Sequence, residues 1–298
     1  MLEVLNAPGR AAYGEDSYSA GELRNWLTSP KVDPERDIRL AEQDGRVIGY
    51  VDVDPQGANP VRWWSDVRVH PDADVPVVGA ELLEWAAARA RSGILRVWTA
   101  SVLEEVRKTY EAAGFRATRH SFRMALDLEG QPEPPTWPAG ITVRTFGAGD
   151  EQVVYEAVKE AWLDTWEPME ESYEEWAHWS YGREEFDPSL WFLAVDGEDV
   201  AGFALCQRSE TRTDTGWVNV LGVRRPWRRR GLGEALLRHS FAEFHRRGFP
   251  RVGLGVDAQS PTGATRLYER AGMHVERRTD FYEKDLEPDS ATSEGQSP

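Results

Sequence analysis

The residues best suited to bind a ligand lie together in residues 217–237. Residues 218–223 have the β-branched pattern of a strand, a loop with five arginines follows, and a helix opens at Gly231. The first turn of a helix leaves backbone N–H groups unpaired, and their dipoles favour an anion. Gly231 and Gly233 carry no Cβ that would hold a phosphate away from the backbone. The sequence therefore predicts a pyrophosphate site at this loop.

A second motif follows downstream, with Tyr268 at its centre. Arg228-x-x-Gly231-x-Gly233, combined with Ala264-x-x-Leu267-Tyr268-x-x-x-Gly272-Met273, resembles the signature of the GNAT superfamily of N-acetyltransferases. The resemblance covers residues 141–286. It implies a mixed sheet whose fourth and fifth strands splay apart, with the pantetheine arm of acetyl-CoA lying in the gap.

The resemblance also implies roles for individual residues. Tyr268 would protonate the departing thiolate as a general acid, and the backbone of the fourth strand would bond to pantetheine and meet the tetrahedral oxyanion. The residues that it assigns to the cofactor are Leu221, Gly222, Val223, Arg228, Arg229, Arg230, Gly231, Leu232, Gly233 and Glu234. One departure is Ser260-Pro261, where the family often has an asparagine.

The sequence gives weaker signals for the residues that bind the acceptor than for those that bind the cofactor. Transfer of acetyl to an amine requires a neutral amine, so a base must remove a proton, often through water. The sequence does not single out that base among Asn219 (as an orienting residue), Asp257, His178, Glu167, Glu170 and Glu171. The tryptophans of residues 162–179 are expected to lie mostly in the core, because aromatic residues at helical spacing usually pack. The candidate substrate-binding residues are Trp162, Trp166, Asn219 and Asp257.

The second half repeats the first in outline. Residues 193–203 match residues 40–50, and Tyr268 matches Tyr110 at an offset of 268 − 110 = 158. In the first copy's phosphate loop, Asp74 replaces Arg228 and Val77 replaces Gly231, at an offset of 154. A carboxylate repels an anion and the valine obstructs its approach, so we expect the first copy to have lost its cofactor site.

The fold expected is α/β (α+β), with two tandem GNAT-like domains, each a mixed, mostly antiparallel sheet flanked by helices. The predicted boundaries are 1–129 for the degenerate N-terminal domain, 130–138 for a Pro-rich linker, 139–287 for the catalytic domain, and 288–298 for a disordered tail. The tandem arrangement is similar to that of mycothiol synthases. That group is expected to carry a glutamate on the fourth strand, where this chain has Trp217.

Other elements follow from periodicity and turn signals. We expect a hairpin over 37–53, strands at 62–69, 94–99 and 141–146, and a final edge strand through 281–282. Helices are expected at 22–27, 82–90, 102–113, 150–162, 173–181 and 262–273.

Composition narrows the function further. A net charge of −16 disfavours nucleic acid and anionic membranes as partners. A single cysteine and scattered histidines give neither a disulfide framework nor a metal site. No apolar run or leader pattern is evident. We therefore expect a cytoplasmic protein. The resemblance implies an enzyme that acetylates an amine, and we expect a small-molecule acceptor, although the residues leave a small metabolite, an antibiotic, a peptide N-terminus and a protein lysine open.

Three alternatives remain open. Gly253-Leu-Gly-Val-Asp-Ala fits G-x-G-x-x-A of dinucleotide oxidoreductases, but its glycines lie inside a strand and no helix opens at Gly255. A non-catalytic acyl-CoA-binding module is the second. Acetylation of a cysteinyl glycoside, as in mycothiol synthases, is the third.

Overall fold

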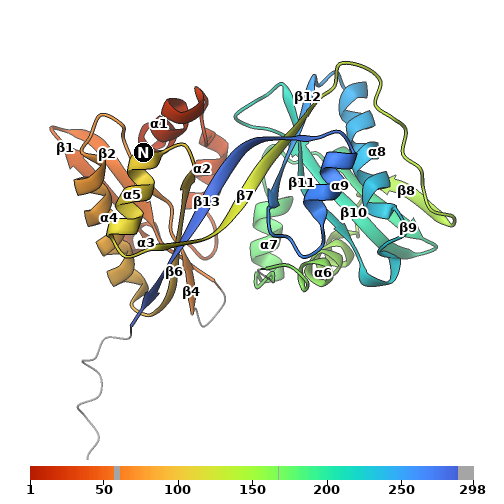
Figure 1. Ribbon diagram of the computed structural model, residues 1–298. Helices are drawn as coiled ribbons and strands as arrows, with labels where there is room; N and C mark the ends of the chain where they lie inside the picture. Colours follow the sequence, from red (N-terminus) through yellow and green to blue (C-terminus); the bar gives the residue numbers. More distant parts are fainter. Residues whose placement is uncertain (57–60, 167, 288–298) are drawn as a thin grey trace, which may run out of the picture. The chain divides into compact units, whose positions relative to one another are not determined.

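The computed structural model describes residues 1–56, 61–166 and 168–287 (Figure 1). The chain forms two compact units. The first contains residues 1–120 together with the chain from Thr279 onward, and the second contains Ser121–Arg278.

The second unit has one sheet covered by helices on both faces. Four strands are antiparallel in the order β11-β10-β9-β8, and β12 runs parallel to β11. The strands are β8 (Ile141–Thr145), β9 (Trp191–Asp196), β10 (Asp199–Arg208), β11 (Thr215–Val223) and β12 (Arg251–Asp257). The helices are α6 (Glu151–Trp162), α7 (Tyr173–Ser180), α8 (Leu232–Arg246) and α9 (Ala264–Arg270), with 3-10 turns η1 (Pro188–Leu190) and η2 (Arg225–Trp227).

Alternating side chains of β10 build two cores, one on each face of this sheet. Phe203 and Leu205 pack with α6 and α7. Ala204 and Cys206 pack with α8, where small side chains let the helix approach the sheet closely. Both faces of β10 are therefore buried, as its burial pattern shows.

The first unit also consists of strands and helices. Its strands are β1 (Ile38–Gln43), β2 (Arg46–Asp52), β3 (Asp54–Pro55), β4 (Arg62–Trp64), β5 (Val67–Val69) and β6 (Gly93–Ala100). Its helices are α1 (Leu2–Tyr13), α2 (Ala20–Leu27), α3 (Pro34–Asp37), α4 (Val75–Ala90) and α5 (Glu104–Ala112). The predicted hairpin is confirmed as β1 and β2.

Several predicted elements need correction here. The single strand expected over 62–69 is two, because β4 pairs with β6 whereas β5 pairs with β2. Helix α4 begins at Val75 and not at residue 82, because Asp74 caps it. Helix α1 was not predicted, since Pro8 and Gly9 are poor helix formers.

Each unit is completed by a strand from the other half of the sequence. Strand β7 (Arg116–Asp127) pairs through Ser121–Asp127 with β12 of the second unit. Strand β13 (His274–Leu286) pairs through Thr279–Leu286 with β6 of the first unit. Tyr282 of β13 is accordingly part of the first unit's core. The final strand is therefore not the edge of the second copy.

The units thus differ from the predicted boundaries at 129 and 139. A strand's sequence pattern specifies extended backbone and a buried face, and it does not specify which sheet receives the strand. Residues 130–138, the predicted linker, contain no helix or strand. The predicted tail, 288–298, lies outside the described residues.

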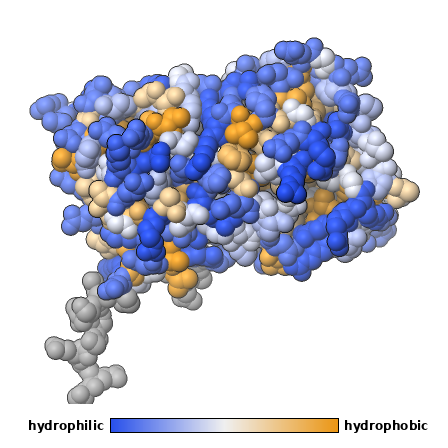
Figure 2. Space-filling view, in the orientation of Figure 1, coloured by the Kyte–Doolittle hydropathy of each residue, from blue (hydrophilic) through white to orange (hydrophobic). Residues whose placement is uncertain are grey.

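The surface in Figure 2 is mostly hydrophilic, and apolar residues appear on it as separate patches. No helix in the described part of the chain has both the length and the apolar character needed to cross a bilayer. Localisation in the cytoplasm stays a prediction.

Candidate functional site

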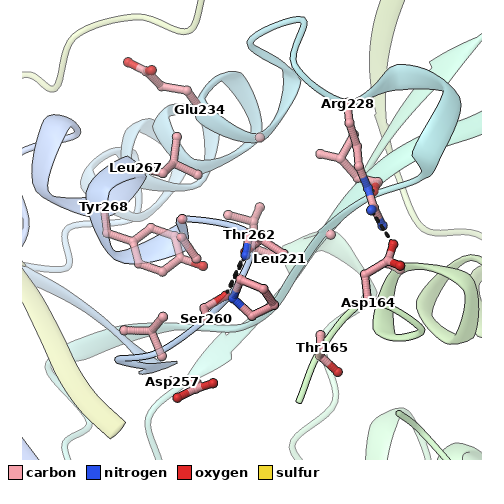
Figure 3. Close-up of a pocket in the computed structure, with 18 of the residues that line it drawn as sticks. Asp164, Thr165, Leu221, Arg228, Glu234, Asp257, Ser260, Thr262, Leu267 and Tyr268 are labelled. Carbon is pink, nitrogen blue, oxygen red and sulfur yellow. Dashed lines mark hydrogen bonds and ion pairs between the residues drawn. The ribbon is translucent and has the colours of Figure 1, made fainter. Parts of the chain in front are cut away.

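Strands β11 and β12 separate halfway along their length. They pair from Thr215 and Arg251 as far as Val218 and Leu254, and no further. A cavity of about 1060 Å3 occupies the opening, lined by both strands and by α8 and α9 (Figure 3). The predicted separation of the fourth and fifth strands is therefore present in this unit.

A β-bulge on β11 marks the point of separation. Leu205 of β10 pairs with Val220 whereas Cys206 pairs with Val218, which leaves Asn219 as the extra residue. A bulge increases the twist of its strand. It therefore helps to turn the following residues, Leu221 to Val223, away from β12 and along the cavity.

Helix α8 begins at the mouth of this cavity with an uncapped N-terminus. Gly231 is the N-cap at φ 84°, and no side chain caps the first turn. Arg229 also has a positive φ, 60°. A Cβ at Gly231 would meet no protein atom within 4 Å, so the space in front of the first-turn N–H groups is open. Such a terminus favours an anion.

The arginines of the preceding loop are not all available to a ligand. Arg225 donates two hydrogen bonds to Asp164, which follows α6, and Arg228 donates to the same carboxylate. These bonds lower the pKa of Asp164. Arg224 pairs with Glu160 of α6 at 2.6 Å. Three of the loop's five arginines are therefore already paired with carboxylates.

Arg228 also forms a hydrogen bond with Val223, another residue that is predicted to contact the cofactor. Its Nε donates to the carbonyl oxygen of Val223 at 2.9 Å, which ties the loop to the end of β11. The assignment of Arg228 and Val223 to the cofactor stays a prediction. Arg230 is exposed, does not line the cavity, and contacts the carbonyl oxygen of Ala139 at 3.5 Å.

Tyr268 reaches into the cavity from α9. Its side chain is 7 % exposed, and in Figure 3 its hydroxyl points toward Leu221 and Ser260. Within the described residues, this hydroxyl has no hydrogen-bond partner. Burial raises the pKa of Tyr268 to about 12, so the phenol is protonated at neutral pH and can donate a proton.

The candidate acceptor residues also border the cavity. Trp162 and Trp166, Asn219 on the bulge, and Asp257 at the end of β12 all line it. Glu170, Glu171 and His178 do not line it, and Glu167 lies outside the described residues. Sequence reasoning missed Asp164 and Arg266. Nothing in the local pattern distinguishes them from other charged side chains in or just after helices.

Ser260 and Pro261 occupy the position where the family often has an asparagine. The hydroxyls of Ser260 and Thr262 lie 2.8 Å apart. The N–H of Thr262 donates to the Ser260 hydroxyl (Figure 3), and the N–H of Ser260 donates to the carbonyl oxygen of Asp257. This turn brings the chain from β12 to α9 along the cavity wall.

Trp217 takes up the space where a strand carboxylate would lie. Its ring covers Gly253, where a Cβ would come within 2.6 Å of the indole. The guanidinium of Arg123 lies 4.9 Å from the centre of the same ring, a cation–π distance.

In the first unit, the equivalent positions are filled by its own side chains. Asp74 caps α4 by accepting a hydrogen bond from the N–H of Val77 at 3.1 Å. Tyr110, the counterpart of Tyr268, lies within 3.3 Å of the carbonyl oxygens of Val67 and Trp98. These residues belong to β5 and β6, the strands that correspond to β11 and β12. Its hydroxyl therefore bridges the gap that is open in the second unit.

Comparison with known proteins agrees with this architecture. The model of the acetyltransferase (GNAT) family matches residues 1–115 and 153–273. The mycothiol acetyltransferase of Thermomonospora curvata is 32% identical over 245 residues, which is 78% of this chain and 77% of that protein.

Solved structures show the same arrangement. A GCN5-related N-acetyltransferase from Sphaerobacter thermophilus is 33% identical, with a TM-score of 0.77 over 96% of this chain and 92% of that one. A tandem GNAT protein from the clavulanic acid biosynthesis pathway, 17% identical, has a TM-score of 0.70 over 96% of this chain and 94% of that one, which shows a shared fold. The chain therefore belongs to the GNAT family of acetyltransferases, enzymes that use acetyl-CoA, and it contains two GNAT regions in tandem.

Proposed function

We propose that the second unit binds acetyl-CoA in the cavity between β11 and β12 and transfers the acetyl group directly to an amine of a small molecule. The observation that supports this most strongly is one cavity bordered by three features: the strand opening, the uncapped terminus of α8 and the phenol of Tyr268. Together they match the chemical parts of the carrier, which are an extended arm, a pyrophosphate and a thioester.

The arm lies along Leu221 to Val223 in this proposal, because these residues face the opening after β12 has diverged. The pyrophosphate lies before α8 and accepts hydrogen bonds from N–H groups of residues 229–234, since the N–H of Arg228 is bonded to the carbonyl oxygen of Arg225. Leu232 packs in the core and Gly233 lies against Leu267, so the packing holds this turn in place before the ligand arrives.

Transfer then needs one bond to form and one to break. The neutral amine attacks the thioester carbonyl, the oxyanion is met by a backbone N–H of β11, and the C–S bond breaks. Tyr268 gives its proton to the departing thiolate, and solvent restores it. The amine proton leaves through water, with Asn219 and Asp257 as the nearest candidates to orient that water.

We assign the chemistry to the second unit because, in the described part of the first, side chains occupy the equivalent positions. Asp74 places a carboxylate where a pyrophosphate would lie, and Tyr110 bonds across the strand opening. The first half of the sequence then contributes strand β7 to the second unit's sheet.

A second candidate acceptor comes from the relatives, which are named mycothiol acetyltransferases. That name favours the cysteinyl glycoside that is acetylated to give mycothiol. Trp217 argues for a different acceptor contact in this chain, because an indole covered by Arg123 offers no carboxylate to an amine. The wall containing Trp162 and Trp166 suits a cationic acceptor with apolar parts.

The test is release of free coenzyme A from acetyl-CoA, followed with a thiol reagent, in the presence of an amine library that includes the cysteinyl glycoside. A cysteine acceptor also reacts with the reagent, so mass spectrometry must detect the acetylated product. Turnover with at least one small amine is expected. Tight binding of acetyl-CoA without turnover for any amine, peptide or glycoside would instead identify a non-catalytic binding module.

A further inference from the structure

Of the arginines that line the second unit's cavity, three have no ion-pair partner in the described residues. Arg225 and Arg228 are paired with Asp164. Arg229, Arg266 and Arg270 line the same cavity, are exposed, and have no hydrogen bond or ion pair within residues 1–56, 61–166 and 168–287. Unpaired cations around a cavity attract an anionic ligand.

Two of the three stand together on α9. Arg266 and Arg270 are four residues apart, so their side chains leave the same face of the helix, about 6 Å apart at Cβ. Leu267, beside them, lies 3.6 Å from the position of a Cβ on Gly233. The pair therefore flanks the first turn of α8, whereas Arg229 belongs to the loop before it.

Coenzyme A carries two separate anionic groups, the pyrophosphate and the phosphate on the 3′ oxygen of its ribose. The N–H groups of α8 and the side chain of Arg229 can bind the pyrophosphate. We infer that Arg266 and Arg270 bind the 3′-phosphate, so that the second unit selects the phosphorylated carrier over its 3′-dephospho form. This inference depends on the proposed function and adds a specificity-determining pair to it.

The cavity next to this pair is a poorer site for a phosphate. A smaller cavity of about 340 Å3 shares Arg270 but is lined by the carboxylates of Asp127, Glu129 and Glu133. Its other cation, Arg238, is already paired with Glu133 at 2.7 Å and with Glu234 at 3.0 Å. A phosphate would be repelled there.

The first unit lacks the pair. At the offset of 158, Arg266 corresponds to Lys108 and Arg270 to Ala112. Lys108 is engaged with Glu104 at 2.7 Å. At these two equivalent positions, the unpaired pair of cations is thus found in the unit with the open strand gap.

The experiment is calorimetric titration of the full chain with coenzyme A and with 3′-dephospho-coenzyme A. The proteins are the wild type, Arg266→Gln/Arg270→Gln, and Arg246→Gln, which removes a charge from the far end of α8. We expect the wild type to prefer coenzyme A by roughly 10-fold, since two exposed charge-assisted contacts are lost with the phosphate. The preference should fall toward one in the double variant and persist in Arg246→Gln.

The affinity for 3′-dephospho-coenzyme A shows whether the substitutions have damaged α9, because this ligand lacks the 3′-phosphate. We expect this affinity to be equal in all three proteins. Equal affinity of the wild type for both ligands would overturn the inference and leave the proposed function standing. An undiminished preference in the double variant would do the same. Failure of the wild type to bind either ligand would overturn both.

Discussion

At the scale of single residues, Tyr268 and Tyr110 show how one motif position can lie in two different surroundings. Both tyrosines are buried on short helices and precede a glycine turn by four residues. Tyr110 donates to backbone of two strands, whereas the hydroxyl of Tyr268 has no partner in the described structure and points into the cavity. The motif predicts a tyrosine in both units, but it does not predict whether the hydroxyl bonds to the backbone or faces a cavity, because that depends on the spacing of the neighbouring strands.

Tyr268→Phe should lower kcat by roughly 100-fold, because positioned proton donors contribute about that much or more. The dissociation constant of acetyl-CoA should change little, since the ring and its packing remain. Steady-state kinetics with the best amine, together with calorimetry, would measure both.

Tyr110→Phe is the matched control. It removes the hydroxyl that bonds to Val67 and Trp98, so it should destabilise the chain by about 1 kcal/mol without changing kcat. Equal kcat values for Tyr268→Phe and the wild type would remove the proposed acid.

A buried carboxyl in the first unit makes stability depend on pH. Burial and the neighbouring Asp66 raise the pKa of Asp52 to about 8, and Tyr50 donates to it at 2.8 Å. An unfolded aspartate loses its proton near pH 4. Between these values the folded state holds the extra proton, so stability should fall as pH rises from 4 to 8, by at most about 1.4 kcal/mol per unit.

The measurement is the free energy of unfolding at pH 6 and pH 8 for the wild type and Asp52→Asn. The variant has no such proton to lose and should show a shallower fall. Parallel pH profiles for the two proteins would show that Asp52 titrates normally.

At the scale of elements, the strand, loop and helix around the cavity were predictable, and the ion pairs that hold the loop were not. Residues 218–223 and the helix from Gly231 follow from local periodicity and glycine chemistry. Asp164 is 61 residues from Arg225 in sequence, and no local pattern links them. The number of arginines that remain free to bind a ligand therefore depends on carboxylates that lie far away in the sequence.

Gly231→Val should abolish acetyl-CoA binding. The new side chain would enter the open space before α8, and a β-branched residue at φ 84° is strained by about 1–2 kcal/mol. Gly197→Val is the control for strain alone, because Gly197 has φ 63° and open space but lies in the β9–β10 turn. Calorimetry would compare the two, and equal losses of binding would attribute the effect to strain.

At the scale of the whole molecule, the exchange of β7 and β13 makes each half depend on the other. The repeat predicted two domains, and the family comparison agrees with two GNAT regions. The domain boundaries drawn from the repeat miss the exchange, because both copies end in a strand and either sheet can accept it. Pairing partners between Thr279–Leu286 and Gly93–Ala100 are set by tertiary structure.

Fragments 1–129 and 139–287 should therefore not fold separately. The first would lack β13 with the buried Tyr282, and the second would lack β7 beside β12. Co-expressed, they should associate and recover the thermal transition of the chain. A chain ending at Glu287, which keeps every described strand, is the control. Cooperative unfolding of either fragment alone would show that the exchanged strands are dispensable.

The number of acetyl-CoA molecules bound per chain tests the central claim most directly. Calorimetric titration of the intact protein should give one molecule per chain, and Gly231→Val should reduce this to none. Two molecules per chain, or one that still binds to the Gly231→Val variant, would contradict the assignment of the cofactor to the second unit alone.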